Sequence, residues 1–169
     1  LVDIGCNNGL VSLIAHQSGF STVTSLDHDA EAIKVLRSVV QERNLAIVAR
    51  AFNFGESLPD VDVVFCGAII HWIFCLTADF HGNFDLIFKY LMAVARRFLI
   101  IEWVEPNDPA IRSFGHINRC STKPEMSYTT EAFRAALERA GNVVHEFNTT
   151  PSRIAFVVST SPTSKLSFS

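Results

Sequence analysis

The sequence predicts an α/β fold, in which a doubly wound, mostly parallel sheet of seven strands ends in a C-terminal antiparallel strand pair. Segments rich in β-branched residues alternate with amphipathic helical patterns through most of the chain, as in repeated strand–helix–strand units. The last two strand segments have little between them, so they form a hairpin and one of them runs against the others. The length of 169 residues corresponds to one domain.

The strand segments are short and bounded by turn residues. Residues 1–4 end at Gly5, and residues 61–65 are apolar enough to be buried on both faces, which is typical of an interior parallel strand. The expected strands cover residues 1–4, 21–26, 46–51, 61–65, 98–101, 143–147 and 154–159.

The helices are bounded by capping residues. Asp29 precedes one amphipathic helix, Asp108 precedes a first-turn proline, and Thr129 or Thr130 begins a helix that Gly141 ends. The expected helices cover residues 10–19, 30–40, 86–95, 109–114 and 131–140. We place the folded domain at residues 1–160 and expect residues 161–169 to be a disordered tail.

Composition excludes several classes of protein. With 49% hydrophobic and 18% charged residues the chain is not intrinsically disordered, and a net charge of -3 argues against nucleic acid as a partner. The longest apolar run, residues 63–76, is too short to cross a bilayer, so we expect no membrane partner. The four cysteines lack a CxxC pair, which indicates reduced thiols in a cytoplasmic protein; neither they nor the histidines have zinc-site spacing, so we expect no metal.

Residues suited to binding a nucleoside gather where the first two strands end. Gly5 and Gly9 let the backbone turn tightly and approach a ligand. Asp3 lies in an apolar strand, where it needs a fixed polar partner. Asp27 ends the second strand about 20 residues later, where a carboxylate can accept both hydroxyls of a ribose. The alternative for Asp27 is a polar residue that merely leads into the next helix.

The spacing of the loop narrows the ligand. A dinucleotide fingerprint requires G-x-G-x-x-G, whereas here the middle glycine is absent and Gly9 comes one residue early. The order acidic-x-Gly-x-Asn-x-Gly, from Asp3 to Gly9, instead resembles the first motif of class I S-adenosylmethionine-dependent methyltransferases. Asn7 replaces the usual middle glycine of that motif, and asparagine enters the left-handed backbone region readily.

The resemblance extends over nearly the whole chain, through Asp27, residues 53–54, 61–73 and 98–102, and the terminal strand pair. Residues 71–73 (His-Trp-Ile) and 102–106 (Glu-Trp-Val-Glu-Pro) are similar to methyltransferase domains of bacterial saccharide-modifying systems.

The resemblance implies a Rossmann-like methyltransferase fold with S-adenosylmethionine as cofactor. Asp3 would orient the methionine amino group, and Asp27 would bind the ribose hydroxyls. Asn53 and Phe54 would flank the adenine, where the Asn53 carbonyl oxygen can accept from the exocyclic amine. The acid that many family members carry near this position is missing. The other implied cofactor contacts are Gly5, Cys6, Asn7 and Gly9 along the methionine and ribose, His28 beside the adenine, and Cys66 near the sulfonium.

Three further side chains are candidates for catalysis. His71 could take a proton from a substrate hydroxyl, because an unperturbed imidazole has a pKa near 6.5; the alternative is an aromatic wall or a satisfied core histidine. Glu102 could hold a substrate hydroxyl or amine, or serve only as an acceptor for neighbouring side chains. His116 is a second candidate base, or a plain polar residue of a long connection.

We therefore expect an S-adenosylmethionine-dependent methyltransferase that modifies a small molecule or saccharide at oxygen. The alternative is a non-catalytic domain of the same fold that binds a partner, which Asn7 and the missing acid near Asn53 motivate. The net charge disfavours a nucleic-acid methyltransferase. Leu1 already lies in the first core strand, where the family has preceding helices. We expect such a segment, or a partner domain or subunit over that region, to complete the acceptor pocket.

Overall fold

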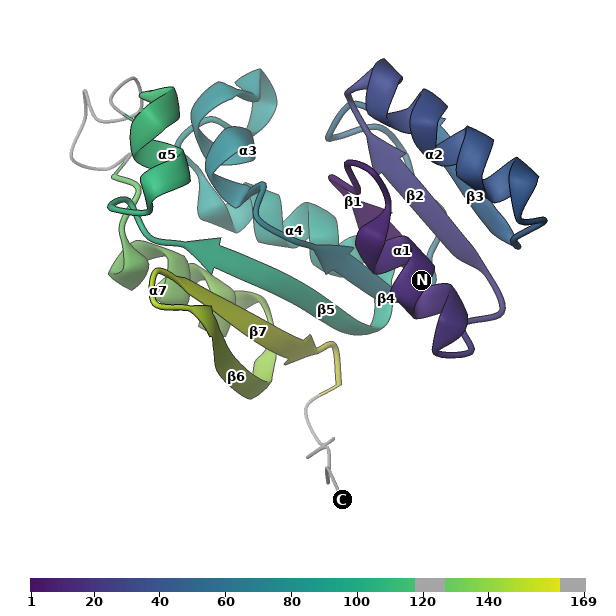
Figure 1. Ribbon diagram of the computed structural model, residues 1–169. Helices are drawn as coiled ribbons and strands as arrows, with labels where there is room; N and C mark the ends of the chain where they lie inside the picture. The colour runs from purple at the N-terminus through teal and green to yellow at the C-terminus, as the bar shows by residue number, and fades with distance from the viewer. Residues whose placement is uncertain (118–126, 162–169) are drawn as a thin grey trace.

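The computed structural model describes residues 1–117 and 127–161, which form one seven-stranded sheet with helices on both faces (Figure 1). The strand order is β3-β2-β1-β4-β5-β7-β6, and β7 alone runs antiparallel to its neighbours. This confirms the predicted fold class. The strands are β1 (Val2–Ile4), β2 (Val23–Asp27), β3 (Ile47–Ala51), β4 (Val61–Cys66), β5 (Ala95–Val104), β6 (Asn142–Thr150) and β7 (Arg153–Ser159).

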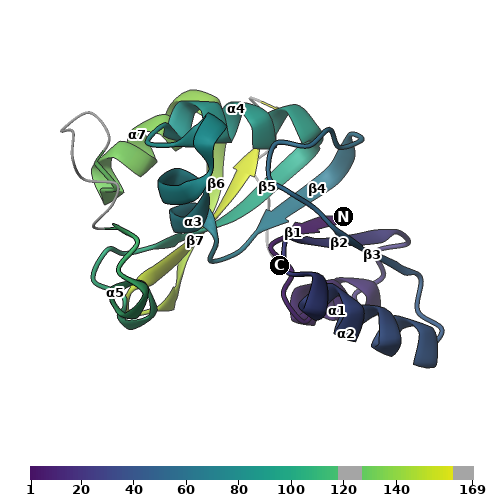
Figure 2. The same ribbon diagram turned by 90° about the horizontal axis from the view of Figure 1, so that it is seen from above.

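The helices divide between the two faces of the sheet. Figure 2 shows α1 and α2 on one face and α4 and α7 on the other. The predicted caps are confirmed, because Asp29, Asp108 and Thr129 each accept a hydrogen bond from a backbone amide in the first turn of the following helix. The helices are α1 (Leu10–Gln17), α2 (Ala30–Glu42), α3 (Ile70–Leu76), α4 (Phe84–Val94), α5 (Pro109–Phe114) and α7 (Thr130–Ala140), with a 3-10 turn at Ala78–Phe80.

The main core lies between the sheet and the face that carries α4 and α7. Trp103 of β5, Phe88 of α4 and Phe133 of α7 are fully buried there, and the Phe133 ring contacts Phe88 edge-on and Trp103 in a tilted arrangement. Residues 52–103 contain 11 aromatic rings, and most of these rings pack in the core, where aromatic side chains bury large apolar areas.

Two features differ from the sequence-based expectation. The helix α3 at Ile70–Leu76 was not predicted; Ala68 takes a left-handed conformation (φ 53°) between β4 and α3, and α3 has no side-chain cap. β5 begins at Ala95, so Arg96 and Arg97 lie in the strand rather than at a helix end. Hydrophobic periodicity is a weak guide at both places because strand and helix are continuous in apolar character.

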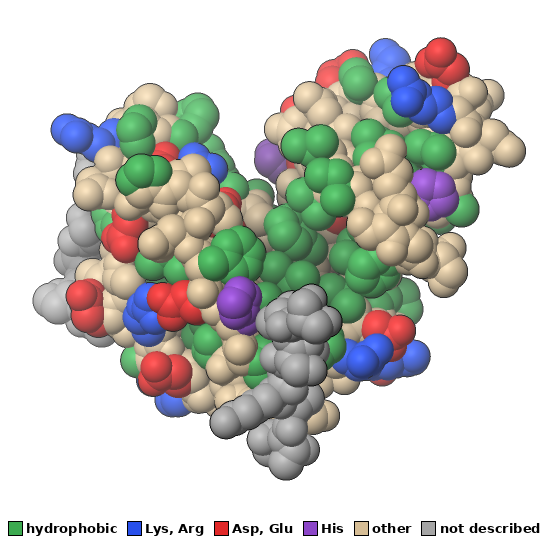
Figure 3. All heavy atoms as spheres, turned by 60° about the horizontal axis from the view of Figure 1, so that its bottom comes forward, with side chains coloured by type: hydrophobic (Ala, Val, Ile, Leu, Met, Phe, Trp, Pro, Cys, Tyr) green, Lys and Arg blue, Asp and Glu red, His purple; other side chains and the backbone are tan. Residues whose placement is uncertain are grey.

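The opposite face of β4, β5 and β7 carries a row of half-buried apolar side chains. Phe65, Ile100 and Val157 are register partners on these three strands, so they share one face. Figure 3 shows hydrophobic side chains gathered in the hollow between the half of the molecule that contains α1 and α2 and the half that contains β5 to β7.

Several sequence-based expectations concern features outside the site. No helix in the described ranges is long and apolar enough to span a membrane. The expectation of four reduced thiols is wrong for Cys75, which is disulfide-bonded, whereas Cys6 and Cys66 are free. Cys120 and residues 162–169 of the expected tail lie outside the described residues.

Candidate functional site

The candidate site lies at the carboxyl edge of the sheet, where the strand order reverses. β1 is hydrogen-bonded to β2 on one side and to β4 on the other, and all three run parallel. Ligands of open α/β sheets bind in the crevice at such a switch point. The predicted residues that follow β1, β2, β3 and β4 are therefore brought to one edge.

The loop after β1 is shaped by three left-handed residues. Gly5 (φ 77°), Asn7 (φ 47°) and Gly9 (φ 80°) turn the chain from β1 into α1, and Asn7 confirms that asparagine is accommodated here. A Cβ at Gly5 would lie 2.5 Å from the Ile69 side chain, and one at Gly9 would collide with Leu36. The loop therefore requires glycine at both positions.

Asp27 connects this loop to the end of β2. Its Oδ2 accepts a hydrogen bond of 2.8 Å from the Asn7 backbone amide, and its Oδ1 accepts one of 2.9 Å from the Asp29 amide. The exposed His28 ring lies beside it, with Nδ1 3.2 Å from Oδ1. A carboxylate offers about four lone-pair positions, so Asp27 keeps capacity for further donors such as ribose hydroxyls.

Asp3 is almost fully buried, with 1% of its surface exposed, and has the fixed polar partner that the sequence requires. The Ser12 hydroxyl of α1 donates to its Oδ2 over 2.6 Å, and the Ser25 hydroxyl of β2 donates to Ser12 over 2.6 Å. Burial raises the pKa of Asp3 to about 6, against the lowering effect of the Ser12 hydrogen bonds and with a smaller contribution from the Asp27 charge.

Asn53 and Phe54 follow β3 directly and lie next to the end of β2, since the Phe52 amide donates to the Asp27 carbonyl over 2.9 Å. Phe54 packs against Phe80 and Tyr90, with ring centroids 4.8 and 4.7 Å away. The Phe54 ring thus anchors the turn that presents Asn53.

The turn also carries an acid that the sequence analysis did not find. Glu56 Oε1 accepts hydrogen bonds of 2.9 Å from both the backbone amide and the side-chain Nδ2 of Asn53. The spacing Asn-x-x-Glu in a turn was the signal available in the sequence. An acidic side chain therefore lies beside Asn53, and its Oε1 is hydrogen-bonded to Asn53 itself.

Cys6 and Cys66 are both buried thiols. Burial raises the pKa of Cys6 to about 12 and raises the pKa of Cys66 further, with the Asp3 charge acting in the same direction on both. Thiols with raised pKa values are neutral and poor nucleophiles at physiological pH. These two residues can line a site but are not suited to covalent chemistry.

The structure brings the two candidate histidines together. His71 in α3 and His116, which follows α5, have ring centroids 4.9 Å apart, and His116 stacks on Trp72 at 3.9 Å. His71 is buried, and desolvation lowers its pKa to about 3, with the nearby His116 and Arg153 acting in the same direction and Asp108 opposing them. A neutral imidazole with so low a pKa is a weak base, which favours the aromatic-wall interpretation of His71.

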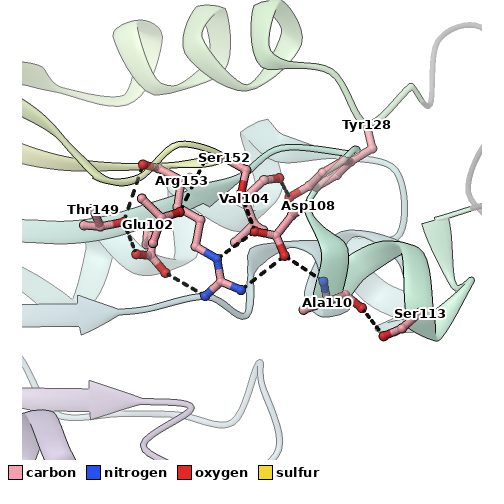
Figure 4. Close-up of polar contacts among 10 residues, drawn as sticks. Glu102, Val104, Asp108, Ala110, Ser113, Tyr128, Thr149, Ser152 and Arg153 are labelled. Atoms are coloured by element: carbon pink, nitrogen blue, oxygen red, sulfur yellow. Dashed lines mark hydrogen bonds and ion pairs between the residues drawn. The ribbon is translucent and has the colours of Figure 1, made fainter.

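Glu102 belongs to a different cluster, at the end of β5 and the β6–β7 hairpin (Figure 4). Thr149 donates to its Oε1 over 2.6 Å, and Arg153 lies 3.9 Å from its Oε2. Arg153 also donates two hydrogen bonds to the buried Asp108, at 2.9 and 3.2 Å. The contacts of Glu102 with protein side chains favour the supporting role over direct substrate binding.

Asp108 organises the connection that carries His116. Its carboxylate caps α5 through the Ala110 amide (2.9 Å) and accepts from the Ser152 hydroxyl (2.7 Å) as well as from Arg153. The Arg153 hydrogen bonds hold the pKa of Asp108 well below its usual range, burial opposes this, and the Ser152 and Ala110 hydrogen bonds add to the lowering. Sequence reasoning missed Arg153 because its partners lie about 45 residues away.

Within residues 1–117 and 127–161, no group of three or more histidine, cysteine, aspartate or glutamate side chains is arranged to hold a metal ion.

Comparison with known proteins agrees with this geometry. A family model described as a methyltransferase domain matches residues 2–92, which is more than half of the chain. The chain is also 31% identical over 65 residues to a ribosomal protein L11 methyltransferase of Thermotoga neapolitana, a match that covers 38% of this chain and 24% of that protein.

Solved structures share the fold. WbdD, one of whose structures is described as a bifunctional kinase-methyltransferase, superimposes with a TM-score of 0.70 at 20% identity over 94% of this chain and 35% of its own. Magnesium protoporphyrin IX methyltransferase of Synechocystis, solved with bound SAH, gives 0.69 at 16% identity over 95% of this chain and 73% of its own. The chain thus spans about a quarter of the curated relative and about a third of WbdD.

Proposed function

The chain belongs to the methyltransferase domain family, whose cofactor is S-adenosylmethionine, and from this premise we propose that it transfers the methyl group of that cofactor to an oxygen of a small molecule or saccharide. The single observation that carries the proposal is the connection of the glycine loop to Asp27 through the Asn7 amide. This hydrogen bond joins the end of β1 to the end of β2, beside the point where the strand order reverses. We call the resulting site, formed by Asp3, the loop from Gly5 to Gly9 and Asp27, the cradle.

The residues of the cradle fit the cofactor part by part. Asp27 has remaining lone pairs for the two ribose hydroxyls, and the exposed His28 and the Asn53 turn lie beside it, where adenine would follow. Asp3, the only charged side chain within β1, offers a carboxylate to the methionine ammonium. Gly5, Cys6, Asn7 and Gly9 present backbone without bulk, and Cys66 ends the adjacent strand.

Methyl transfer asks this chain mainly to bind and orient. When bound, the cofactor supplies a methyl group on a sulfonium, whose carbon–sulfur bond breaks as the acceptor oxygen bonds to the methyl carbon. The cradle holds the cofactor, and the aromatic wall of His71, Trp72 and His116 excludes water from the neighbouring crevice. The acceptor hydroxyl releases its proton to solvent or to His116, because the low pKa of His71 makes it a weak base and Glu102 is held by Thr149 and Arg153.

The proposed acceptor class follows from the net charge and from two short segments of the sequence. The net charge of -3 disfavours nucleic acid, and the segments at residues 71–73 and 102–106 resemble those of saccharide-modifying methyltransferases. The sequence relative is named for a ribosomal protein substrate, so a protein acceptor is the competing class.

The non-catalytic alternative loses one of its motivations, because Asn7 adopts the left-handed conformation that the loop needs. Glu56 lies beside Asn53 but is hydrogen-bonded to it, so it does not stand in for the acid that many family members carry there.

Calorimetric titration with S-adenosylhomocysteine tests the proposal directly. We expect saturable binding by the folded protein, and no binding by protein with a normal cooperative melt would overturn the proposal. Incubation with methyl-labelled cofactor and separate pools of saccharides, small alcohols and ribosomal protein then identifies the acceptor class. Label transfer to protein alone would contradict the small-molecule or saccharide assignment, and binding without transfer to any pool would favour the partner-binding alternative.

A further inference from the structure

The turn after β3 fixes the orientation of one amide side chain. Asn53 lies on the surface, yet its Nδ2 donates a hydrogen bond of 2.9 Å to Glu56 Oε1, which also accepts from the Asn53 backbone amide. An ionised carboxylate can only accept hydrogen bonds, so the side-chain NH2 group of Asn53, and not its side-chain oxygen Oδ1, must face Glu56. Oδ1 of Asn53 therefore points away from Glu56.

Glu56 is itself held from three directions. The Tyr90 hydroxyl of α4 donates to its backbone carbonyl over 2.7 Å, and Arg50 of β3 lies 3.5 Å from its Oε2. The backbone amide of Glu56 donates to the backbone carbonyl of Asn53 over 3.1 Å, and this hydrogen bond closes the turn. The hydrogen bonds from Asn53, followed by the Arg50 charge, lower the pKa of Glu56, so it remains an ionised acceptor at neutral pH.

The outward oxygen has a definite place relative to the cofactor cradle. Phe52 donates its amide to the Asp27 carbonyl, and Asn53 is the next residue, so the amide lies one residue beyond the strand end where the ribose binds in the proposed function. Both hydrogen bonds of Asn53 to side chains within the described ranges end on Glu56 Oε1, and neither uses Asn53 Oδ1. An amide oxygen in this place accepts from an exocyclic amine and repels a carbonyl.

We infer that Glu56, by fixing the Asn53 amide with its oxygen outward, selects a six-amino purine over a six-oxo purine in the cofactor. This inference rests on the proposed function and adds a specificity-determining residue to it. Glu56 does not touch the base in this arrangement. Glu56 acts by keeping the Asn53 side-chain amide from rotating by a half-turn. A rotated amide would present Nδ2 to the base and favour the six-oxo purine.

The experiment compares two ligands that differ in one group. Dissociation constants of S-adenosylhomocysteine and S-inosylhomocysteine are measured by calorimetry for the unmodified chain, for Glu56→Ala and for Glu56→Lys. The unmodified chain should prefer the adenosyl ligand by about tenfold or more, the equivalent of one hydrogen bond. In Glu56→Ala the amide rotates freely, so the ratio should fall toward one.

Glu56→Lys gives an opposite prediction. An ammonium can only donate, so it captures Asn53 Oδ1 and turns Nδ2 outward, and the preference should move to the inosyl ligand. Glu31→Ala is the matched control, because Glu31 is an exposed glutamate paired with Lys34 and should leave the ratio unchanged.

The outcomes separate this inference from the proposed function. If Glu56 only stabilised the turn, both affinities would fall together in both variants and the ratio would stay constant, which would overturn the inference. Binding of S-adenosylhomocysteine by the unmodified chain without preference over the inosyl ligand would also overturn it while the proposed function stands. Failure of the folded, unmodified chain to bind either ligand would overturn both.

Discussion

The backbone amide of Asn7 donates a hydrogen bond of 2.8 Å to the carboxylate of Asp27, 20 residues further along the chain. Asp27 therefore has two roles: it is proposed to bind the ribose, and it holds the loop that is proposed to surround the cofactor. Removal of the Asp27 side chain should therefore affect both ligand binding and the stability of the fold.

Asp27→Ala should weaken S-adenosylhomocysteine binding by at least tenfold and also lower the free energy of unfolding by about 1–3 kcal/mol. The loss of stability follows because the Asn7 and Asp29 amides lose their acceptor at a site that is only 8% exposed. Calorimetry and urea denaturation measure the two effects.

Asp29→Ala is the control for this pair of effects. Asp29 caps α2 through the Glu31 and Ala32 amides, so its loss should cost about 1 kcal/mol of stability without a tenfold loss of binding. Equal losses of affinity in the two variants would show that binding follows stability alone and would remove Asp27 from the ribose site.

Asp3→Asn should make the protein more stable and the cofactor bind less tightly. Burial raises the pKa of Asp3 from 3.8 to about 6, so the folded state binds a proton more readily than the unfolded state. Stability from this residue is therefore greatest below about pH 4 and falls as the pH rises through 6. The charged side chain costs on the order of 2–3 kcal/mol at neutral pH.

Urea denaturation between pH 4 and 7 checks the sign. The difference in free energy of unfolding between Asp3→Asn and the unmodified chain should grow with pH across this range. Binding of S-adenosylhomocysteine at pH 7 should fall, because asparagine brings no charge to the ammonium. A difference independent of pH would contradict the raised pKa, and unchanged binding would contradict the ammonium role.

His71→Phe should reduce the loss of stability in acid. The folded pKa of about 3 lies below the unfolded value near 6.5, so protonation favours the unfolded state. The contribution of His71 to stability is complete above pH 6.5 and is lost progressively as the pH falls toward 3. Phenylalanine keeps an aromatic ring against Trp72 and His116 and removes the titration.

The measurement is the free energy of unfolding at pH 7 and pH 4.5, with His81→Phe as a control at an exposed histidine. We expect the decrease between the two pH values to be smaller in His71→Phe than in the control. If methyl transfer is found, its rate should keep any inflection between pH 6 and 7 in His71→Phe. Loss of that inflection would restore His71 as the base.

Arg153→Ala should lower the free energy of unfolding by about 2–3 kcal/mol at pH 7, because it leaves the buried Asp108 carboxylate without its cation. Arg139→Ala is the matched control: Arg139 makes similar paired hydrogen bonds to Asp85, but both side chains are exposed, so the cost should stay within about 1 kcal/mol.

The Arg153 prediction has a pH test. The lowered pKa of Asp108 means that its ion pair stabilises the fold above about pH 4 and that this stabilisation is lost as the pH falls further. The difference in stability between the two arginine variants should therefore be complete at pH 7, begin to narrow below about pH 4 and still be partly present at pH 3, because the folded pKa of Asp108 lies well below its ordinary value. A constant difference would show that Arg153 acts through packing.

The strands and all the described α-helices but α3 followed from the sequence, because each depends on interactions over a few residues. The Asp29, Asp108 and Thr129 caps, the turn at Gly5 to Gly9 and the hairpin that reverses β7 all belong to this class. The helix α3 was missed because it has no side-chain cap and continues the apolar run of β4. The need of Asp3 for a polar partner also followed, since burying an unpaired carboxylate is costly.

The sequence alone determined the fold class and the cradle at the ends of β1 and β2, since short-range spacing encodes both. Only the tertiary structure decided the chemistry of the candidate catalytic side chains. His71 is a weak base because it is buried and because His116 and Arg153 lower its pKa further, and Glu102 is hydrogen-bonded to Thr149 and lies close to Arg153 of the hairpin. A pKa depends on charges and solvent exclusion contributed by segments far along the chain, and local sequence patterns carry no record of those neighbours.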